Sequence, residues 1–468
     1  MATPNRKNQL DDISLYRKQV LTSPYANGLD IEEVGHFLDG INDNRFASVK
    51  LTEQKQKPFL QPRGGFPTFV SQNKLSEALY QAGADFIPLT IDSNTRHNAY
   101  SRAGVLLERS EEEGKNYLNG YPLVNHGFAL SRQLYTNIDA PISLRHGTPD
   151  ARLLVEIAIA SGITEIEGGG LVYTLPYSED FPIDLSLIYW QYVNRVCALY
   201  STNKRSIHRE SFGPLTATMV PPVIVIVIEL IELLLAAEQG VTSFSVSFGQ
   251  TGSVTQDLAI GSVLRTLAHK YLNLFAFENV KVSLVYHHWM GAFPQDRNLA
   301  LGLITTSTLI AKLVNADKVV LKTQDEAFGI PTIQANCDAV RLAAYVLNKT
   351  AITGQLDSVA VLNEIDLLSS EVEYLLNAIF NIPGEVFWES VFQAVIRGYI
   401  DVPFAPHKVN ANLLITQRDP KFAIRILNPG RIPISEESLC QERGMLSKNS
   451  DLNNKLVSKL LSDINIML

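Results

Sequence analysis

The chain has 468 residues, of which 46% are hydrophobic and 19% are charged, so it can bury a large core and disorder is excluded as its main state. Its net charge of −8 argues against a general nucleic-acid-binding or anionic-membrane surface, because either surface would favour clustered Lys and Arg.

Cysteine use and hydropathy set the expected location. Cys197, Cys337 and Cys440 show no C-x-x-C spacing, so the sequence indicates neither a disulfide framework nor a structural zinc site. The first 20 residues lack the apolar stretch of a secretion signal. The most apolar segment, 217–228, meets Glu229 and Glu232 before it spans a bilayer. We therefore expect a cytoplasmic protein without a membrane span.

The pattern along the chain predicts three regions. Residues 1–55 are polar with helical spacing and form an N-terminal helical extension. From residue 56, short runs rich in Val, Ile, Leu, Phe and Tyr stop at a polar residue beside Gly or Pro, and longer segments with helical spacing follow. Residues 341–468 begin with helical patterns and become rich in Pro, Gly and Asn, which predicts a C-terminal helical and irregular appendage. The nine short runs are 58–65, 85–96, 120–127, 142–147, 164–170, 206–214, 243–252, 282–291 and 318–326.

This alternation favours a parallel sheet built from right-handed β-α units. Helical patterns between the runs, such as 151–162, 228–240, 258–272 and 305–316, support it. Eight units close a (β/α)8 TIM barrel, which we predict for residues 56–340. Since there are nine runs, one of them is not a barrel strand. An open doubly wound sheet is the alternative, but no G-x-G-x-x-G follows a predicted strand.

Charged residues follow several of the predicted strands. In such barrels the active site collects at the C-terminal ends of the strands. Arg63, Arg96 and Arg145 at one mouth would form a strongly cationic site for a dicarboxylate or a phosphate. Glu167, followed by three glycines that permit close approach of backbone or ligand, is suited to an ammonium group. An amino dicarboxylic acid satisfies both charge types. The other strand-end candidates are Asn119, Phe212, His287, His288 and Lys322.

Each candidate also has a purely structural interpretation. A single arginine at a strand end is more often a surface ion-pair partner, and Glu167 can simply pair with an arginine. By spacing alone, Tyr173 and Tyr177 are more often packing residues, and Phe212 and Met290 are more often pocket wall or core. His287 and His288 are adjacent on a strand and point to opposite faces, so at most one enters the site.

Eight stretches together resemble the epsilon (E) subunit family of glutamate mutase, also called methylaspartate mutase, and this resemblance covers residues 55–411. It implies a (β/α)8 barrel and an isomerase that interconverts L-glutamate and (2S,3S)-3-methylaspartate by a radical mechanism with adenosylcobalamin. It also implies a homodimer of this chain within a heterotetramer that includes two small cobalamin-binding sigma (S) subunits. The stretches are "TIDSNTRHNAY", "LNGYPLVNHG", "RHGTPDARLL", "EGGGLVYTLPY", "FGPLTATMVPP", "LLAAEQGV", "HHWMGAFPQD" and "KTQDEAFGIPT".

The resemblance assigns roles to individual positions. It implies that Glu167 meets the substrate amino group and acts as general base, and that Arg96 and Arg145 are catalytic. Glu326 is suited to ribose hydroxyls. The implied substrate contacts are Arg63, Arg96, Arg145, His146, Glu167, Tyr173 and Tyr177. The implied cofactor contacts are Gly65, Asn119, Pro176, Phe293, Lys322, Glu326 and Ile330.

The metal ligand is expected elsewhere. His288 and Gly291 fit part of the D-x-H-x-x-G loop whose histidine binds cobalt in many cobalamin proteins, but Tyr286 stands at the place of the Asp. We therefore expect no metal ligand in this chain and a cobalt ligand from the small subunit. The apolar segment 221–240 is more β-branched than the family segment, which leaves open a changed partner surface or substrate.

Three other functions stay open at this point. A related cobalamin-dependent mutase acting on a different amino acid would leave one of the arginines unpaired. A metal-dependent barrel hydrolase would use His126, His146, His287 or His288 with Asp92, although their spacing gives it little support. A non-catalytic barrel homologue would serve only as a binding scaffold.

Overall fold

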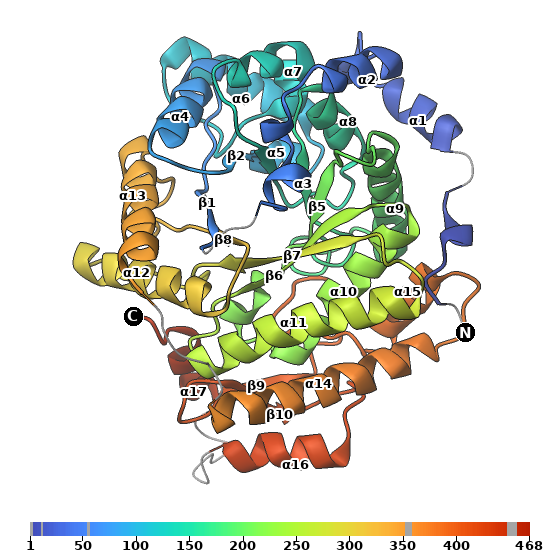
Figure 1. Ribbon diagram of the computed structural model, residues 1–468, viewed down its shortest axis with the longest axis vertical. Helices are drawn as coiled ribbons and strands as arrows, with labels where there is room; N and C mark the ends of the chain where they lie inside the picture. Colours follow the sequence, from blue (N-terminus) through green and yellow to red (C-terminus); the bar gives the residue numbers. More distant parts are fainter. Residues whose placement is uncertain (1–2, 11–12, 54–56, 352–357, 447–455) are drawn as a thin grey trace.

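Eight parallel strands form a barrel at the centre of the molecule (Figure 1), in a computed structural model that describes residues 3–10, 13–53, 57–351, 358–446 and 456–468. Their order is β1-β8-β7-β6-β5-β4-β3-β2. The ring is completed between β1 and β2, where Phe86 N donates to Leu60 O at 3.2 Å and Thr90 N donates to Gly64 O at 3.0 Å. The predicted TIM barrel is confirmed. The strands are β1 (Phe59–Gln61), β2 (Ile87–Thr90), β3 (Ile142–Arg145), β4 (Glu165–Glu167), β5 (His208–Glu210), β6 (Ser243–Gly249), β7 (Lys281–His287) and β8 (Lys318–Val320).

The predicted run at 120–127 is not a barrel strand. Tyr121 makes a single parallel bridge to Ile91, and the helix α7 (Leu123–Ser131) begins two residues later. Pro122 has no N–H to donate to a strand ladder, so the run cannot continue as a central strand. The other eight runs each coincide with one of the strands β1 to β8, although β7 begins one residue before its run.

Helices follow the strands and cover the barrel from outside. Side-chain caps fix where several of them begin: Thr68 accepts from Ser71 N, Asp296 from Asn298 N, and Thr332 from Ala335 N. These outer helices are α4 (Phe69–Gln81), α5 (Ser93–Arg96), α6 (Tyr100–Glu113), α7, α8 (Arg152–Ala160), α9 (Ile183–Leu199), α10 (Pro222–Glu238), α11 (Val254–Leu274), α12 (Arg297–Leu313) and α13 (Ile333–Lys349), with short 3-10 turns η4 (Arg132–Tyr135) and η5 (Pro214–Thr218).

The barrel interior is polar, unlike the apolar layer between strands and helices. Side chains alternate along a strand, so one set faces the barrel axis and the other faces the helices. Outward residues such as Leu144 and Ile166 are fully buried. Inward residues bond across the barrel, for example Lys318 Nζ to Glu165 Oε1 at 2.6 Å and Gln61 Nε2 to Ser143 Oγ at 3.1 Å. The interior is therefore a connected polar network that leads toward the mouth.

The N-terminal part is helical and packs beside α8 (Figure 1). It comprises η1 (Arg6–Asn8), α1 (Ile13–Leu21), η2 (Pro24–Ala26), α2 (Ile31–Asp39), η3 (Asp43–Arg45) and α3 (Ala47–Lys50). Arg17 of α1 anchors it, since its Nε donates to the buried Glu156 Oε1 of α8 at 2.7 Å. In the described parts of the chain, no helix combines the length and the apolar character needed to cross a membrane.

The C-terminal part lies against α11 and α9 and reaches the mouth of the barrel (Figure 1). Thr416 Oγ1 donates to Met219 O at 2.7 Å, and Arg418 Nη1 donates to Thr251 O at 2.6 Å. Helix α13 crosses residue 340, and the expected division of the chain there stays a prediction. The elements are α14 (Val359–Phe380), α15 (Phe387–Ile396), the antiparallel strands β9 (Ile415–Arg418) and β10 (Ile424–Asn428), α16 (Glu436–Met445) and α17 (Leu456–Ile464).

Candidate active site

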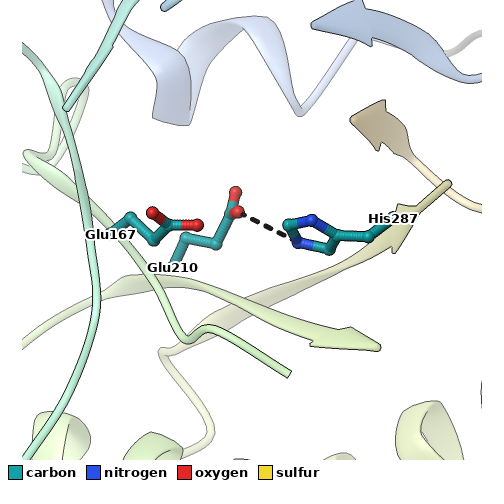
Figure 2. A group of neighbouring side chains, drawn as sticks. All are labelled: Glu167, Glu210 and His287. Carbon is teal, nitrogen blue, oxygen red and sulfur yellow. Dashed lines mark ion pairs between the residues drawn. The ribbon is translucent and has the colours of Figure 1, made fainter. Parts of the chain in front are cut away.

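Polar side chains from four strands meet where those strands end. Arg145, Glu167, Glu210 and His287 are the last residues of β3, β4, β5 and β7. Figure 2 shows Glu167, Glu210 and His287 converging on one point of the barrel axis, and their nearest ligand-type atoms all lie within 4.8 Å of one another. All four residues are buried, and burial together with Arg145 lowers the pKa of His287 well below its ordinary value. The charges of Arg145, Glu167 and Glu210 must therefore be balanced inside the protein.

Arg145 supplies positive charge that balances both Glu167 and Glu210. Its Nη1 donates to Glu210 Oε1 at 2.8 Å, and its Nη2 forms an ion pair with Glu167 Oε1. Burial alone would lower the pKa of Arg145, but Glu167 and Glu210 raise it above its ordinary value. The guanidinium is therefore permanently charged and held by two carboxylates.

Glu210 and Lys318 extend the network into the barrel. Lys318 Nζ lies 2.5 Å from Glu210 Oε2 and 2.6 Å from Glu165 Oε1. Burial would raise the pKa of Glu210, but Lys318 and Arg145 together hold it far below its usual range. The sequence interpretation missed both residues and named Phe212 for this strand. The two-residue alternation puts Glu210 on the same face as His208, but only the pairing with neighbouring strands decides that this face points inward.

Glu167 is protonated more easily than Glu210. The Tyr173 hydroxyl donates to Glu167 Oε2. Burial and the neighbouring Glu210 raise the pKa of Glu167 to about 7, although Arg145 and Tyr173 act in the opposite direction. A carboxyl group that titrates near neutral pH is suited to general acid–base work or to binding a cation that restores its charge.

Arg63 and Arg96 lie beside this network without carboxylate partners. Arg96 Nε donates to Ile91 O at 2.7 Å, and Arg63 Nη1 lies 3.2 Å from Met290 Sδ. Among the described residues, neither guanidinium forms an ion pair with a carboxylate. Burial lowers the pKa of Arg96, and the charge of Arg63 lowers it further, which shows that the two cations are close. Arg63 and Arg96 thus give the site positive charge that can bind an anionic ligand.

Aromatic side chains form the wall of the site. Tyr173 contacts Tyr177 and Phe212 with ring centroids 5.8 Å apart in each case, and Phe212 contacts the His287 ring at 5.6 Å. His146 packs against Tyr173 at 4.8 Å, and burial together with nearby arginines lowers its pKa well below the usual value. A hollow of about 230 Å³ opens above Tyr177 and Phe212 and is lined by Pro176, Tyr177, Phe212, Pro214, Leu215, Ala217, Thr218, Met290 and residues 402–406.

The model of the family described as methylaspartate mutase E chain (MutE) matches residues 42–466. The chain belongs to the methylaspartate mutase E chain family. The match confirms the predicted resemblance and extends it beyond residue 411, to the C-terminal part that the motifs left out.

Two relatives that match most of the chain are both named glutamate mutase epsilon subunit. The glutamate mutase epsilon subunit of Treponema denticola is 38% identical over 99% of this chain and 96% of its own length. That of Escherichia coli O157:H7 is 39% identical over 94% of this chain and 92% of its own length. Among solved structures, the tryptophan synthase alpha chain of Legionella pneumophila subsp. pneumophila covers 69% of this chain and 98% of its own, with 14% identity and a TM-score of 0.35.

The residues expected to contact a cofactor in the mutase family lie around the rim of the mouth. Lys322 Nζ pairs with Glu326 Oε2 at 2.5 Å and lies 5.9 Å from the centre of the Phe293 ring. Asn119 Oδ1 accepts from Ser93 N at 2.9 Å, while Ile330 is 48% exposed. Pro176 lines the hollow. A Cβ atom on Gly65 would lie 2.2 Å from Thr90 O, so packing within the chain alone requires glycine there.

The two adjacent histidines of this mutase chain point to opposite sides, as predicted. His287 faces the barrel axis, with Nε2 at 3.9 Å from Glu210 Oε1 (Figure 2). His288 faces α12, where its Nε2 lies 3.2 Å from Thr308 Oγ1 and its Nδ1 accepts from Lys322 N at 3.3 Å. Both ring nitrogens of His288 are therefore engaged within the chain.

The histidines proposed for a metal-dependent hydrolase do not gather around one point. His126 bonds to Pro67 O at 2.8 Å, and Asp92 caps α5 through its Oδ1. Within the described residues, the one group of three potential metal ligands is Glu167, Glu210 and His287. Because Arg145 already pairs with both of these carboxylates, a divalent cation there would meet strong repulsion.

Proposed function

We propose that this chain is the catalytic subunit of an adenosylcobalamin-dependent mutase that interconverts L-glutamate and (2S,3S)-3-methylaspartate. The family membership supports this proposal, and one feature of the site carries it. Two guanidinium groups without carboxylate partners, Arg63 and Arg96, lie beside the Arg145–Glu167 ion pair at the mouth of a closed barrel.

The charges of glutamate match this arrangement. Its two carboxylates are suited to the three arginines, since guanidinium groups bind carboxylates through paired hydrogen bonds. Its ammonium group is suited to Glu167, whose ionised form gains from a neighbouring cation. His146, Tyr173 and Tyr177 complete the proposed contacts. A substrate that lacked one carboxylate would leave a half-buried arginine without an anionic partner.

The rim residues fit an adenosyl group. Glu326 offers a carboxylate that can accept hydrogen bonds from ribose hydroxyls, and Lys322 holds that carboxylate in place. The half-exposed Ile330 and the hollow beside Pro176 offer apolar surface. Gly65, Asn119 and Phe293 are further proposed contacts. When bound, adenosylcobalamin supplies the radical that removes a hydrogen atom from the substrate.

The residues of this chain bind and orient the substrate and shield its reactive forms from water. Arginines at both carboxylates keep the two parts of the carbon skeleton within reach of each other while their connection changes, which lowers the entropic cost of recombination. Tyr173 and Glu167 hold the amino end, with Glu167 able to accept a proton from the ammonium nitrogen. The buried rings of Tyr173 and Phe212, with the part-exposed Tyr177 packed against both, give the site an apolar wall that can limit access of water to reactive species.

A second protein is part of the proposal. Since both nitrogens of His288 are engaged, we expect the cobalt ligand to come from a small cobalamin-binding sigma (S) subunit. We propose a homodimer of this chain with two small subunits. The three cysteines are free, which supports the reducing cytoplasm as its location.

The direct test combines the full chain with a cognate small subunit and adenosylcobalamin, and follows conversion of L-glutamate to 3-methylaspartate by proton NMR. We expect product only when both proteins and the cofactor are present. The Treponema denticola epsilon subunit with its own partner serves as the positive control. Turnover by the control and none by this chain would contradict the proposal.

A further inference from the structure

The loop that carries Glu167 is held by a buried arginine on one side. Arg209, the central residue of β5, is 1% exposed and points away from the barrel axis. Its Nη1 donates to Ile166 O and its Nη2 donates to Gly168 O at 2.7 Å. Its Nε donates to Asn194 Oδ1 at 2.7 Å. One guanidinium therefore binds the carbonyl groups on both sides of Glu167.

A buried carboxylate holds the same loop from the other side. Glu232 of α10 accepts hydrogen bonds from Leu171 N at 2.7 Å and from Val172 N at 3.4 Å. A Cβ atom on Gly169 would lie 2.3 Å from Glu232 Cδ. The glycine run after Glu167 was predicted to permit close approach of backbone or ligand, and the group that approaches Gly169 is a side chain of this same chain.

The loop also orients Tyr173 against Glu167. Gly168 has a φ of +118°, which disfavours other residues, and a Cβ atom there would lie 2.3 Å from the Tyr173 ring. Tyr173 N donates to Gly169 O at 3.1 Å, and the Tyr173 hydroxyl donates to Glu167 Oε2. The segment fixed by Arg209 and Glu232 therefore sets the position of both groups at the amino end of the site.

Helix α10 contains other buried glutamates that do not touch this loop. Glu229 accepts from Ser211 Oγ at 2.7 Å and Ser247 N, and Glu238 accepts from Asn5 N and Asn8 Nδ2 at 3.0 Å. Burying a carboxylate in so apolar a helix is costly unless its hydrogen bonds are satisfied. Glu238 thus offers a matched comparison: same helix, same residue type, and a pKa that burial raises to about 7, as for Glu232.

We propose that Arg209 and Glu232 are positioning residues: by binding the carbonyl and N–H groups of residues 166–172, they place the Glu167 carboxylate and the Tyr173 hydroxyl to receive the substrate ammonium group. This inference rests on the proposed function, since it concerns recognition of the amino end of glutamate. Within the part of the chain that the structure describes, Arg63 and Arg96 make no hydrogen bond to this loop. Arg145, the last residue of β3, contacts it through Glu167 but is also held by Glu210.

The test compares two diacids that differ only in the amino group. Binding of L-glutamate and of glutarate is measured by calorimetry on the full chain with its small subunit, for wild type, Glu232→Gln, Arg209→Lys and the control Glu238→Gln. We expect Glu232→Gln and Arg209→Lys to weaken glutamate binding about tenfold, because a misplaced carboxylate loses a charge-assisted hydrogen bond. Glutarate binding should weaken less than glutamate binding, because Arg63 and Arg96 are untouched and Glu210 still holds Arg145. Glu238→Gln should change neither affinity.

Hydrogen exchange gives a second readout that does not involve substrate. The amides of Leu171 and Val172 should exchange faster in Glu232→Gln than in wild type, and at the wild-type rate in Glu238→Gln. Equal loss of glutamate and glutarate affinity, or unchanged exchange at these amides, would overturn the positioning role. A wild-type chain that does not distinguish the two diacids contradicts the proposed function instead, and the exchange data still decide whether Glu232 holds the loop.

Discussion

The floor of the site and its rim are built in opposite ways. On the floor, Arg145, Glu167 and Tyr173 are 3%, 2% and 0% exposed, and each is held by partners within the chain. On the rim, Ile330 is 48% exposed and Phe328 is 70% exposed. Floor groups stand on strand ends or on a clamped loop, whereas the exposed rim residues Phe328 and Ile330 stand on the loop after β8. The floor is thus organised before any ligand binds, and the rim has apolar surface left for a further group.

This contrast has an energetic consequence. Removing one partner from a buried ion pair leaves an uncompensated charge, which costs about 3–5 kcal/mol of stability. Substituting a half-exposed apolar residue changes stability by about 0.5 kcal/mol or less. Floor variants should therefore affect folding and substrate together, and rim variants should affect only the assembly with cofactor and partner.

The largest effect is expected for Arg145→Met. Losing the guanidinium leaves Glu167 and Glu210 without their shared cation and removes a substrate contact. We predict roughly a thousandfold loss of glutamate turnover and about 3 kcal/mol lower stability, measured by product formation and by urea unfolding. Arg109→Met, at an exposed ion pair on α6, is the control and should change neither quantity. Unchanged kinetics in Arg145→Met would remove this residue from the site.

Arg63→Met and Arg96→Met should separate binding from stability. Neither guanidinium has a carboxylate partner among the described residues, so its removal leaves no buried anion behind. We predict about a hundredfold lower kcat/KM for glutamate in each variant, without loss of stability in urea. A strongly destabilised Arg96→Met would show that this side chain is structural.

The pH profile tests Glu167. Because its pKa is about 7, kcat/KM for glutamate should rise with pH through about 7 and level off above it, as the carboxylate that binds the ammonium group forms. Tyr173→Phe removes a hydrogen bond that lowers the pKa of Glu167, so the midpoint should move to higher pH. A flat wild-type profile between about pH 6 and 8 would contradict this role.

The raised pKa of Glu167 also makes the stability of the chain depend on pH. Its pKa in the folded chain lies above the ordinary value of 4.5, so between pH 4.5 and about 7 the folded state holds a proton that the unfolded state releases. The contribution of Glu167 to the free energy of unfolding therefore falls as pH rises through this window. Comparing urea unfolding of wild type and Glu167→Gln at both ends of the window measures it. Equal pH dependence of the two proteins would count against the raised pKa.

The smallest effect is expected at the rim. We predict that Ile330→Ser raises the concentration of small subunit needed for half-maximal activity about threefold, because it removes half-exposed apolar surface and little else. Stability and glutamate binding should stay unchanged. A loss of glutamate affinity would show that rim and floor are not independent.

Much of the architecture could be predicted because strand ends have a fixed place in a barrel. Alternating apolar runs and helical patterns predicted the TIM barrel, which is confirmed, and the motifs predicted the family, which is confirmed by the match over 42–466. The same rule placed Arg63, Arg96, Arg145 and Glu167 at one mouth, where the structure has them. Their roles toward substrate and cofactor stay predictions.

The features that could not be predicted from the sequence depend on strand register or on contacts between residues far apart in the chain. The run at 120–127 is too short to distinguish a strand from a helix by periodicity. Glu210 and Lys318 lie on three-residue strands, and which residues face inward depends on the pairing register with neighbouring strands. Glu232, the side chain that approaches Gly169, is 61 residues from Leu171 along the chain. No local sequence pattern therefore predicts this contact.

The most direct test of the account is a crystal structure of the chain with its small subunit, cobalamin and L-glutamate. The account predicts one glutamate molecule with its carboxylates on Arg63, Arg96 and Arg145 and its ammonium group on Glu167. Glutamate bound in another cavity, or with its ammonium group turned away from Glu167, would contradict it.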